Sequence, residues 1–432
     1  MSTFFNLKQR YLAPKVMQMS EKGRALIFFT DTFPYGKGEV FIENEFPYLH
    51  AAFDKVVIVT NNMSETSTRP IPDNVSVVRY PYEASALSKA KATTSFFTPA
   101  IQHEMDFVKK KLQIPASKLV VATMVASYAK ANESLKFIDN TIERYAAGMD
   151  VYLYSYWMND MAIAIAFYKQ KYPKVKAFAR AHGWDVYFER HKPAYLPFRN
   201  YIVSNLDACY AISEDGRRYI QDKVSSNKNK IQLARLGTVN NVQGIASTDG
   251  TLRIVSCSNA IPLKRIHLII EALAQITDVE ISWTHFGNGE LLNKLKQQAS
   301  ELLDGKANIQ YQFAGQVSNA ELMQYYSTNT VDLFINVSET EGIPVSIMEA
   351  HSFGIPAIAT NVGGVSEVTN NHNGRLIDAN SSVEDIAQKI AKYASLSTQI
   401  KQQFRENAYA TWNNIYNAQK NYTAFVDGVM KL

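Results

Sequence analysis

Short apolar runs alternate with helical patterns along almost the whole chain, and this alternation limits the possible folds more than any other feature. In the first half, the strand-like runs are "ALIFFT", "KVVIVTNN", "VYLYSY", "VKAFARAH", "ACYAIS" and "IQLARLG". A second series consists of "LRIVSCS", "EISWTHFG", "IQYQFAG", "VDLFINVS", "PAIAT" and "GRLID". Repeated strand–helix units predict parallel sheets with helices on both faces. The predicted fold class is therefore α/β, with two doubly wound sheets.

The stretch 238–251, "TVNNVQGIASTDGT", is polar and has no periodicity, which is typical of an exposed linker between domains. At 432 residues the chain is also too long for one ordinary hydrophobic core. We therefore predict an N-terminal Rossmann-like domain over 1–240 and a C-terminal one over 250–403. Residues 83–147 have helical patterns without a clear strand, and we expect them to insert helices into the first domain. The amphipathic segment 404–432 is expected to pack on the N-terminal domain.

The composition indicates a soluble globular protein. Hydrophobic residues make up 46% and charged residues 20%, a balance that excludes disordered and collagen-like chains. No apolar run is long enough for a membrane span, and the first residues lack the pattern of a secretory signal. The two cysteines, Cys209 and Cys257, lie in separate strand-like runs, so no disulfide framework is expected. These features predict a cytoplasmic location.

The net charge is +5, and basic residues gather at 109–111, 169–176 and 189–192. Solvated surface lysines are the favoured explanation. The alternative is a patch for anionic lipid, which would place the protein at the inner face of the membrane as a peripheral protein. Nucleic acid is not among the predicted partners.

The segment 338–368, "SETEGIPVSIMEAHSFGIPAIATNVGGVSEV", carries Glu341 and Glu349 on either side of its first Gly-Ile-Pro corner. A strand is expected to end before this corner, and proline suits the first turn of a helix. The N–H groups at a helix start and the helix dipole attract anions. The main chain of the corner, formed by Gly342, Ile343, Pro344 and Val345, is therefore predicted to bind an anion such as a phosphate group.

The two glutamates, Glu341 and Glu349, have different surroundings in this prediction. Glu341 lies at the mouth of the corner, whereas Glu349 lies inside the helix, where a carboxylate needs a partner such as a pair of sugar hydroxyls. For either residue alone, the alternative is a solvated loop glutamate or a helix glutamate bonded to protein donors. The presence of both around one corner favours a binding site.

The segment resembles the E-x7-E signature of family-4 retaining glycosyltransferases, which have the GT-B fold of two facing Rossmann-like domains. The resemblance covers the second half well and extends more loosely to "TDTFPYGKGEVFIENE", "RAHGWDV" and "ARLGT" in the first half. It implies that Glu349 binds the ribose of a nucleotide sugar and that Glu341 holds the sugar ring. It also implies that His182, at the end of a strand, lies over the donor sugar.

Lys264 and Arg265 precede a helical pattern in "VSCSNAIPLKRIHLII", and two cations at a helix start suit a diphosphate. The stretch resembles the family's phosphate-binding segment, in which an arginine and a lysine hold the leaving nucleoside diphosphate. The lysine matches Lys264, but Asn259 occupies the usual arginine position. Either Arg265 compensates or the leaving group is held less tightly. A Lys-Arg pair before a helix can also be an ordinary surface feature.

Glycine-bearing turns complete the predicted site. Gly287 and Gly289 follow a strand and resemble the family's glycine turn beneath the nucleotide, although the third glycine of a dinucleotide fingerprint is absent. The turn around Val317 resembles the segment that faces the base. In the first domain, Gly36 and Gly38 follow the first strand and are expected on the acceptor side. A tight turn without a ligand is the alternative for each.

No Asp-x-Asp pair and no metal-ligand spacing of His or Cys occurs, so no metal or other cofactor is expected. The predicted function is retaining, hexosyl-type transfer from a nucleoside diphosphate sugar, taken as a UDP-sugar, to a hydroxyl of a glycan or lipid-linked acceptor. Its use in surface polysaccharide or glycolipid synthesis follows from the resemblance alone. One alternative is a nucleotide-sugar 2-epimerase or phosphorylase on the same fold. The other is a non-catalytic GT-B subunit that binds a glycan or another glycosyltransferase.

Overall fold

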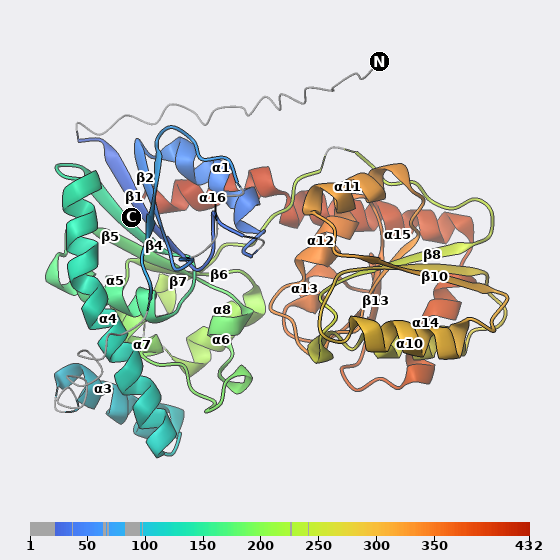
Figure 1. The fold of residues 1–432 in the computed structure, drawn as a ribbon, viewed down its shortest axis with the longest axis horizontal. Helices are drawn as coiled ribbons and strands as arrows, with labels where there is room; N and C mark the ends of the chain where they lie inside the picture. The colour runs from blue at the N-terminus through green and yellow to red at the C-terminus, as the bar shows by residue number, and fades with distance from the viewer. Residues whose placement is uncertain are drawn as a thin grey trace.

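The computed structural model describes residues 22–36, 38–63, 66, 69–82, 96, 98–224, 227–240 and 242–432. The first residues, which were searched for a secretory signal, and residues 83–95 of the predicted helical insertion lie outside these ranges. The described chain forms two α/β domains, each built on a parallel sheet (Figure 1). The predicted fold class of two Rossmann-like domains is therefore confirmed.

The first sheet has seven parallel strands in the order β3-β2-β1-β4-β5-β6-β7. Its strands are β1 (Arg24–Thr30), β2 (Lys55–Thr60), β3 (Val75–Arg79), β4 (Asp150–Ser155), β5 (Lys176–Ala181), β6 (Ala208–Ala211) and β7 (Ile231–Leu233). The helical elements described in this domain are α1 (Ile42–Ala52), α3 (Pro99–Phe107), η2 (Val108–Leu112), α4 (Lys118–Tyr145), α5 (Asp160–Lys171), α6 (Gly183–Val186), η3 (Phe188–Arg190), α7 (Arg199–Asn205), α8 (Glu214–Lys223) and η4 (Lys228–Lys230). The strand order reverses between β1 and β4.

The second sheet has six parallel strands in the order β10-β9-β8-β11-β12-β13. Its strands are β8 (Leu252–Cys257), β9 (Ile281–Phe286), β10 (Ile309–Gly315), β11 (Leu333–Asn336), β12 (Ala357–Thr360) and β13 (Gly374–Ile377). The helical elements are η5 (Pro262–Lys264), α9 (Ile266–Ala274), α10 (Leu292–Leu303), α11 (Asn319–Thr328), α12 (Val345–Ser352), α13 (Val365–Val368) and α14 (Val383–Ala394). Here the order reverses between β8 and β11, and this reversal positions the candidate site.

Strand β3 was not predicted from the sequence. It pairs with β2 at the edge of the first sheet, and Val75 is its one fully buried residue. An edge strand that is half covered has a weaker apolar pattern than a central strand. The described part of the predicted insertion is helical, as expected, and α4 packs along α5.

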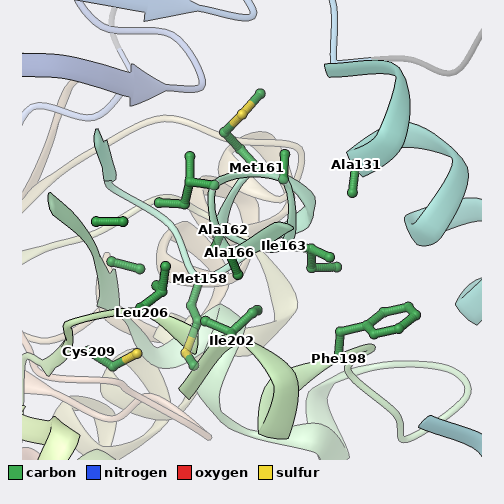
Figure 2. Close-up of a cluster of buried hydrophobic side chains, with 14 of the residues drawn as sticks. Ala131, Met158, Met161, Ala162, Ile163, Ala166, Phe198, Ile202, Leu206 and Cys209 are labelled. Carbon is green, nitrogen blue, oxygen red and sulfur yellow. The ribbon is translucent and has the colours of Figure 1, made fainter. Parts of the chain in front are cut away.

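Apolar side chains cover both faces of each sheet. In β1, Ala25 and Ile27 belong to one core layer, whereas Leu26 and Phe28 belong to the other, because neighbouring strand residues point to opposite faces. This burial on both sides explains the unbroken apolar run in the sequence. Figure 2 shows part of the first layer, in which Cys209 lies among apolar residues of α5 and α7. Burial raises the pKa of the Cys209 thiol to about 12.

The C-terminal segment is shared between the two domains. Helix α15 (Thr398–Thr411) packs against α12, the π-helical turn η6 (Trp412–Tyr416) interrupts the helix, and α16 (Ala418–Val429) packs against α1 (Figure 1). Trp412 and Tyr416 are buried in a cluster that contains Ile212 and Leu236 of the first domain beside residues of the second domain. Of the predicted segment 404–432, the part from η6 onward therefore contacts the first domain, whereas the part in α15 packs against α12 of the second domain. No described helix combines the length and the apolar character needed to cross a membrane.

Candidate functional site

The predicted residues for the diphosphate and the sugar of the donor lie on loops at the carboxyl ends of β8 and β11, two neighbouring strands of the second sheet. The loop after β8 carries Asn259, Lys264 and Arg265, and the loop after β11 carries Glu341 and the corner 342–345. Open parallel sheets bind ligands where the strand order reverses, outside the carboxyl ends of the strands. The fold thus brings two sequence-distant loops to the position where this architecture places ligands.

Lys264 and Glu341 connect these two loops directly. The Lys264 Nζ lies 2.6 Å from the Glu341 Oε1, and the Asn336 Nδ2 donates to the same oxygen at 3.2 Å. Burial raises the pKa of Glu341, but the Lys264 charge and the donated hydrogen bonds outweigh burial, so that the pKa is lowered. Glu341 is therefore an ionised, oriented carboxylate. Asn336, which orients it, had no recognisable signal in the sequence.

Glu349 lies inside α12, as predicted, and Pro344 caps the start of this helix and does not belong to its first turn. Its Oε1 accepts a hydrogen bond of 2.6 Å from the Asn319 Nδ2. Burial raises the pKa of Glu349 to about 7, and the Asn319 hydrogen bond lowers it in part. Asn319 begins α11 just after the Val317 turn, so that this turn lies beside Glu349. The sequence predicted that Glu349 needs a partner but did not identify Asn319.

Arg265 is already bonded to protein. Its Nε, Nη1 and Nη2 donate to the main-chain carbonyls of Val337, Ala379 and Ser338 at 2.7, 2.8 and 3.2 Å. A guanidinium has five N–H groups, so three of them are used. Arg265 thus joins the β8 loop to the end of β11, and little donor capacity is left for an anion. The sequence left open whether Arg265 compensates for the missing arginine at position 259. This geometry argues against such compensation.

Gly287 and Gly289 lie where two loops come close together. A Cβ at Gly287 would lie 1.9 Å from the Ser258 carbonyl oxygen, and one at Gly289 would lie 2.5 Å from that of Ala260. Their φ angles are 144° and 157°. The close packing of the loop after β9 against the loop after β8 therefore explains glycine at both positions. This explanation needs no ligand and corresponds to the alternative of a tight turn without a ligand.

His182 follows β5 in the first domain and begins α6. Its ring is surrounded by aromatic rings, with centroids 4.6 Å away for Tyr156 and Trp157 and 5.9 Å for Phe41. Neither ring nitrogen has a hydrogen-bond partner among the described residues. Burial, and secondly the charge of Arg180, lower the pKa of His182 well below its usual value. The imidazole is therefore neutral near pH 7 and retains hydrogen-bonding capacity for a ligand.

Gly36 and Gly38 lie on the loop after β1, where their carbonyls accept hydrogen bonds from Arg69 at 3.1 and 2.8 Å. Glu39 fixes this loop because its carboxylate accepts hydrogen bonds from three main-chain N–H groups and from the Trp157 Nε1. Since Trp157 also packs on His182, the loop of the two glycines predicted on the acceptor side is connected to the histidine through Trp157.

The two domains touch next to these residues. A Cβ at Gly183 would lie 2.6 Å from the Gly342 Cα, so only glycine permits the observed approach. The Arg190 Nη2 donates a hydrogen bond to the Thr340 Oγ1 across the same contact. The chain thus places His182 and the Glu341 loop at one junction between the domains. From the sequence, Arg190 was expected in the surface cluster of basic residues at 189–192. Local sequence patterns do not show contacts between domains.

Glu367 of α13 binds the first domain at the start of α8. Its carboxylate accepts hydrogen bonds from the main-chain N–H groups of Glu214 and Asp215, each at 2.9 Å, and from the Arg235 Nη2 at 3.1 Å. A carboxylate at a helix start is stabilised by the unpaired N–H groups and by the helix dipole. Glu367 therefore stabilises the observed arrangement of the domains.

We expect Glu367→Gln to favour separation of the domains. A neutral amide is stabilised at a helix start by about 0.3–2 kcal/mol less than a carboxylate. Small-angle scattering is the measurement, and a larger radius of gyration is the expected result. Glu384→Gln is the matched control, because Glu384 lies in the first turn of α14 within its own domain. A radius of gyration equal to that of the wild type would show that Glu367 does not hold the domains together.

Among the described residues, no group of three His, Cys, Asp or Glu side chains is placed to hold a metal ion. The positive charge at the junction comes instead from Lys264 and Arg190, together with the start of α12. An arrangement of this kind can bind an anionic group, with an ionised carboxylate and a neutral histidine beside it.

Comparisons with known proteins concern the second half of the chain and the overall fold. Residues 240–411 match the family Glycosyl transferases group 1. The O-antigen biosynthesis glycosyltransferase WbnH of Escherichia coli is 26% identical over 214 residues, which are 49% of this chain and 58% of WbnH. The putative teichuronic acid biosynthesis glycosyltransferase TuaC of Bacillus subtilis is 34% identical over 111 residues, 26% of this chain and 27% of TuaC. The matches thus span about half or less of these relatives.

Solved structures resemble almost the whole chain. The lipopolysaccharide outer core galactosyltransferase WaaB has a TM-score of 0.66 at 14% identity, covering 95% of this chain and 100% of WaaB. Anabaena Alr3699/HepE, solved in complex with UDP and glucose, has a TM-score of 0.63 at 14% identity, covering 94% and 100%. The chain therefore has the GT-B fold, and its residues 240–411 match the group 1 glycosyltransferase family.

Proposed function

We propose that the protein transfers a sugar from a nucleoside diphosphate sugar to a hydroxyl acceptor, with retention at the anomeric carbon. The observation that carries this proposal is the Lys264–Glu341 pair beside the start of α12, at the point where the strand order of the second sheet reverses. His182 of the first domain lies on the other side of the same junction. The match of this region to a glycosyltransferase family supports the proposal.

The chemistry follows from the charges at the junction. When the bond between the anomeric carbon and the diphosphate breaks, negative charge grows on the diphosphate and positive charge on the sugar ring. A fixed cation and a helix start stabilise the diphosphate more in the transition state than in the ground state. Lys264 and the main chain of 342–345 have this role. Glu341 and His182 orient the sugar, and a diphosphate oxygen accepts the proton of the acceptor hydroxyl.

The substrate assignment extends this proposal. In it, Glu349 binds the ribose, and Gly287, Gly289 and Val317 lie next to the nucleotide. The donor is a UDP-sugar, in line with the complex of HepE with UDP and glucose. The acceptor is a glycan or a lipid-linked glycan of a surface polysaccharide, in line with the names of WbnH and TuaC. The acceptor binds on the side of the Gly36–Gly38 loop.

Transfer is expected to continue in EDTA, because the proposed site neutralises the diphosphate with Lys264 and a helix start instead of a divalent cation. The measurement is the rate of nucleoside diphosphate release from UDP-sugars with and without EDTA. Rates that fall to background in the chelator and recover with added magnesium or manganese would contradict a metal-independent site.

Product analysis by NMR tests the function itself. The wild type is incubated with UDP-glucose, UDP-galactose or UDP-N-acetylglucosamine and a glycan acceptor, and the anomeric configuration of the product is compared with that of the donor. We expect a new glycosidic bond with unchanged configuration. A 2-epimerised nucleotide sugar, a sugar phosphate formed with free phosphate, or an inverted linkage would each overturn the proposal in its present form.

A further inference from the structure

The proposed diphosphate site in the second domain is short of cations. Asn259 is neutral, and three of the five N–H groups of Arg265 donate to main-chain carbonyls. Lys264 is paired with Glu341 at 2.6 Å, so part of its charge is already balanced. A leaving nucleoside diphosphate carries more than one negative charge. The second domain alone therefore supplies less positive charge than the proposed reaction requires.

Arg190 brings a further cation to this place from the first domain. It ends η3, and its Nη2 donates to the Oγ1 of Thr340, the residue before Glu341. A Cβ at Gly183 would lie 2.6 Å from the Arg190 Nη1, so the guanidinium also lies against the contact between Gly183 and Gly342. Lys264 and Arg190 thus approach the 340–342 stretch from different domains.

The positive charge of Arg190 is offset only in part by the carboxylates of Glu341 and Asp215. Its guanidinium forms no ion pair with any carboxylate in the part of the chain that the structure describes, and it lies over the Tyr187 ring at 4.8 Å. Burial lowers the pKa of Arg190, while Tyr187, Glu341 and Asp215 raise it in part. A partly buried cation that forms no close ion pair is stabilised when an anion binds beside it. A guanidinium is well shaped for phosphate, because it donates two parallel hydrogen bonds.

We propose that Arg190 binds the diphosphate of the nucleotide sugar and supplies the positive charge that Asn259 does not. This inference rests on the proposed function. The bond from the anomeric carbon to the diphosphate oxygen breaks, and its electron pair stays on that oxygen, which Arg190 and Lys264 stabilise. The acceptor oxygen forms the new bond to the anomeric carbon, and its proton passes to a diphosphate oxygen. Because Arg190 comes from the first domain, full stabilisation requires the two domains to be in contact.

The test compares the binding of a nucleoside diphosphate with that of its nucleoside, by calorimetry on the full chain. UDP with uridine and GDP with guanosine are the probes, and the variants are Arg190→Gln, Asn259→Arg and the double variant. The glutamine amide can still donate to Thr340, so this substitution removes the charge and keeps a donor. Arg144→Gln is the matched control, because Arg144 also lies over a tyrosine ring, that of Tyr145 at 5.2 Å, on the surface of α4.

We expect Arg190→Gln to weaken binding of the diphosphate about tenfold or more and to leave nucleoside binding unchanged, because a hydrogen bond to a charged group is lost. Asn259→Arg should restore diphosphate affinity in the double variant, and Arg144→Gln should bind like the wild type. An equal loss for diphosphate and nucleoside would overturn the assignment. The assignment would also be overturned if Arg190→Gln bound the diphosphate as tightly as the wild type while Lys264→Ala bound it weakly. That result would leave the proposed function intact. If the wild type binds neither diphosphate, the proposed function fails as well.

Discussion

Lys264→Ala is expected to lower the turnover number for sugar transfer by about 100-fold or more, the loss seen when one preorganised donor to a developing oxyanion is removed. Lys264 ends η5 and reaches the Glu341 carboxylate at 2.6 Å, so its ammonium is fixed before the reaction begins. The charge that it stabilises grows during bond breaking. The substitution should therefore affect the turnover number much more than the KM for the acceptor.

Steady-state kinetics with saturating nucleotide sugar measure this effect. Lys296→Ala is the control, because Lys296 is an exposed lysine of α10 in the same domain. Lys264→Arg keeps the charge and should retain more activity than Lys264→Ala. The role of Lys264 at the leaving group would be refuted by a folded Lys264→Ala protein whose turnover number lies within a few-fold of the wild-type value.

Glu349→Ala is expected to weaken nucleoside diphosphate binding by about 1.5–3 kcal/mol, the contribution of a hydrogen bond to a charged group. Glu349 is 8% exposed, and its carboxylate has the amide of Asn319 as a hydrogen-bond donor. Calorimetric titration with UDP and GDP is the measurement. Glu301→Ala, on the exposed face of α10, is the control. Wild-type nucleotide affinity in a folded Glu349→Ala protein would exclude the ribose assignment.

The same residue predicts a pH dependence. Burial raises the pKa of Glu349 to about 7, so its carboxyl changes from mostly protonated to mostly ionised as the pH rises through this value. An ionised carboxylate accepts a ribose hydroxyl more strongly than a neutral one. Nucleotide affinity should therefore increase with pH across this range in the wild type, and this dependence should be absent in Glu349→Gln. The contribution of Glu349 to the free energy of unfolding changes with pH in the opposite direction to nucleotide affinity. Because the pKa is raised in the folded protein, this contribution is fully present below 4.5, the pKa in the unfolded chain, and is lost as the pH rises through 7.

The central strands of both sheets could be predicted because they are buried on both faces, which leaves continuous apolar runs such as that of β1. Strand β3 could not, because its single fully buried residue gives no such run. The division of the C-terminal segment at η6 depends on where Trp412 and Tyr416 are buried. Their apolar character was visible in the sequence, but the residues of both domains that bury them were not.

The candidate site shows the same limit. Lys264, Glu341 and Glu349 follow from local patterns, because a cation before a helix and a carboxylate inside one have direct physical meanings. The partners of these residues come from other elements: Asn319 lies 30 positions from Glu349 and Asn336 precedes the corner at the end of β11. Arg190 lies 150 positions from Thr340 and belongs to the other domain. Such contacts are set by tertiary packing, which no local pattern encodes.

Titration of the wild type, Lys264→Ala and Glu349→Ala with UDP and GDP tests the central claim most directly, because nucleotide binding between these two loops underlies every other assignment. The account predicts saturable binding of one nucleoside diphosphate by the wild type, with stabilisation against unfolding of about 2.7 kcal/mol at 100 times the dissociation constant. Both variants should bind it more weakly. Binding of neither nucleotide by the wild type, or equal affinity in all three proteins, would contradict the account.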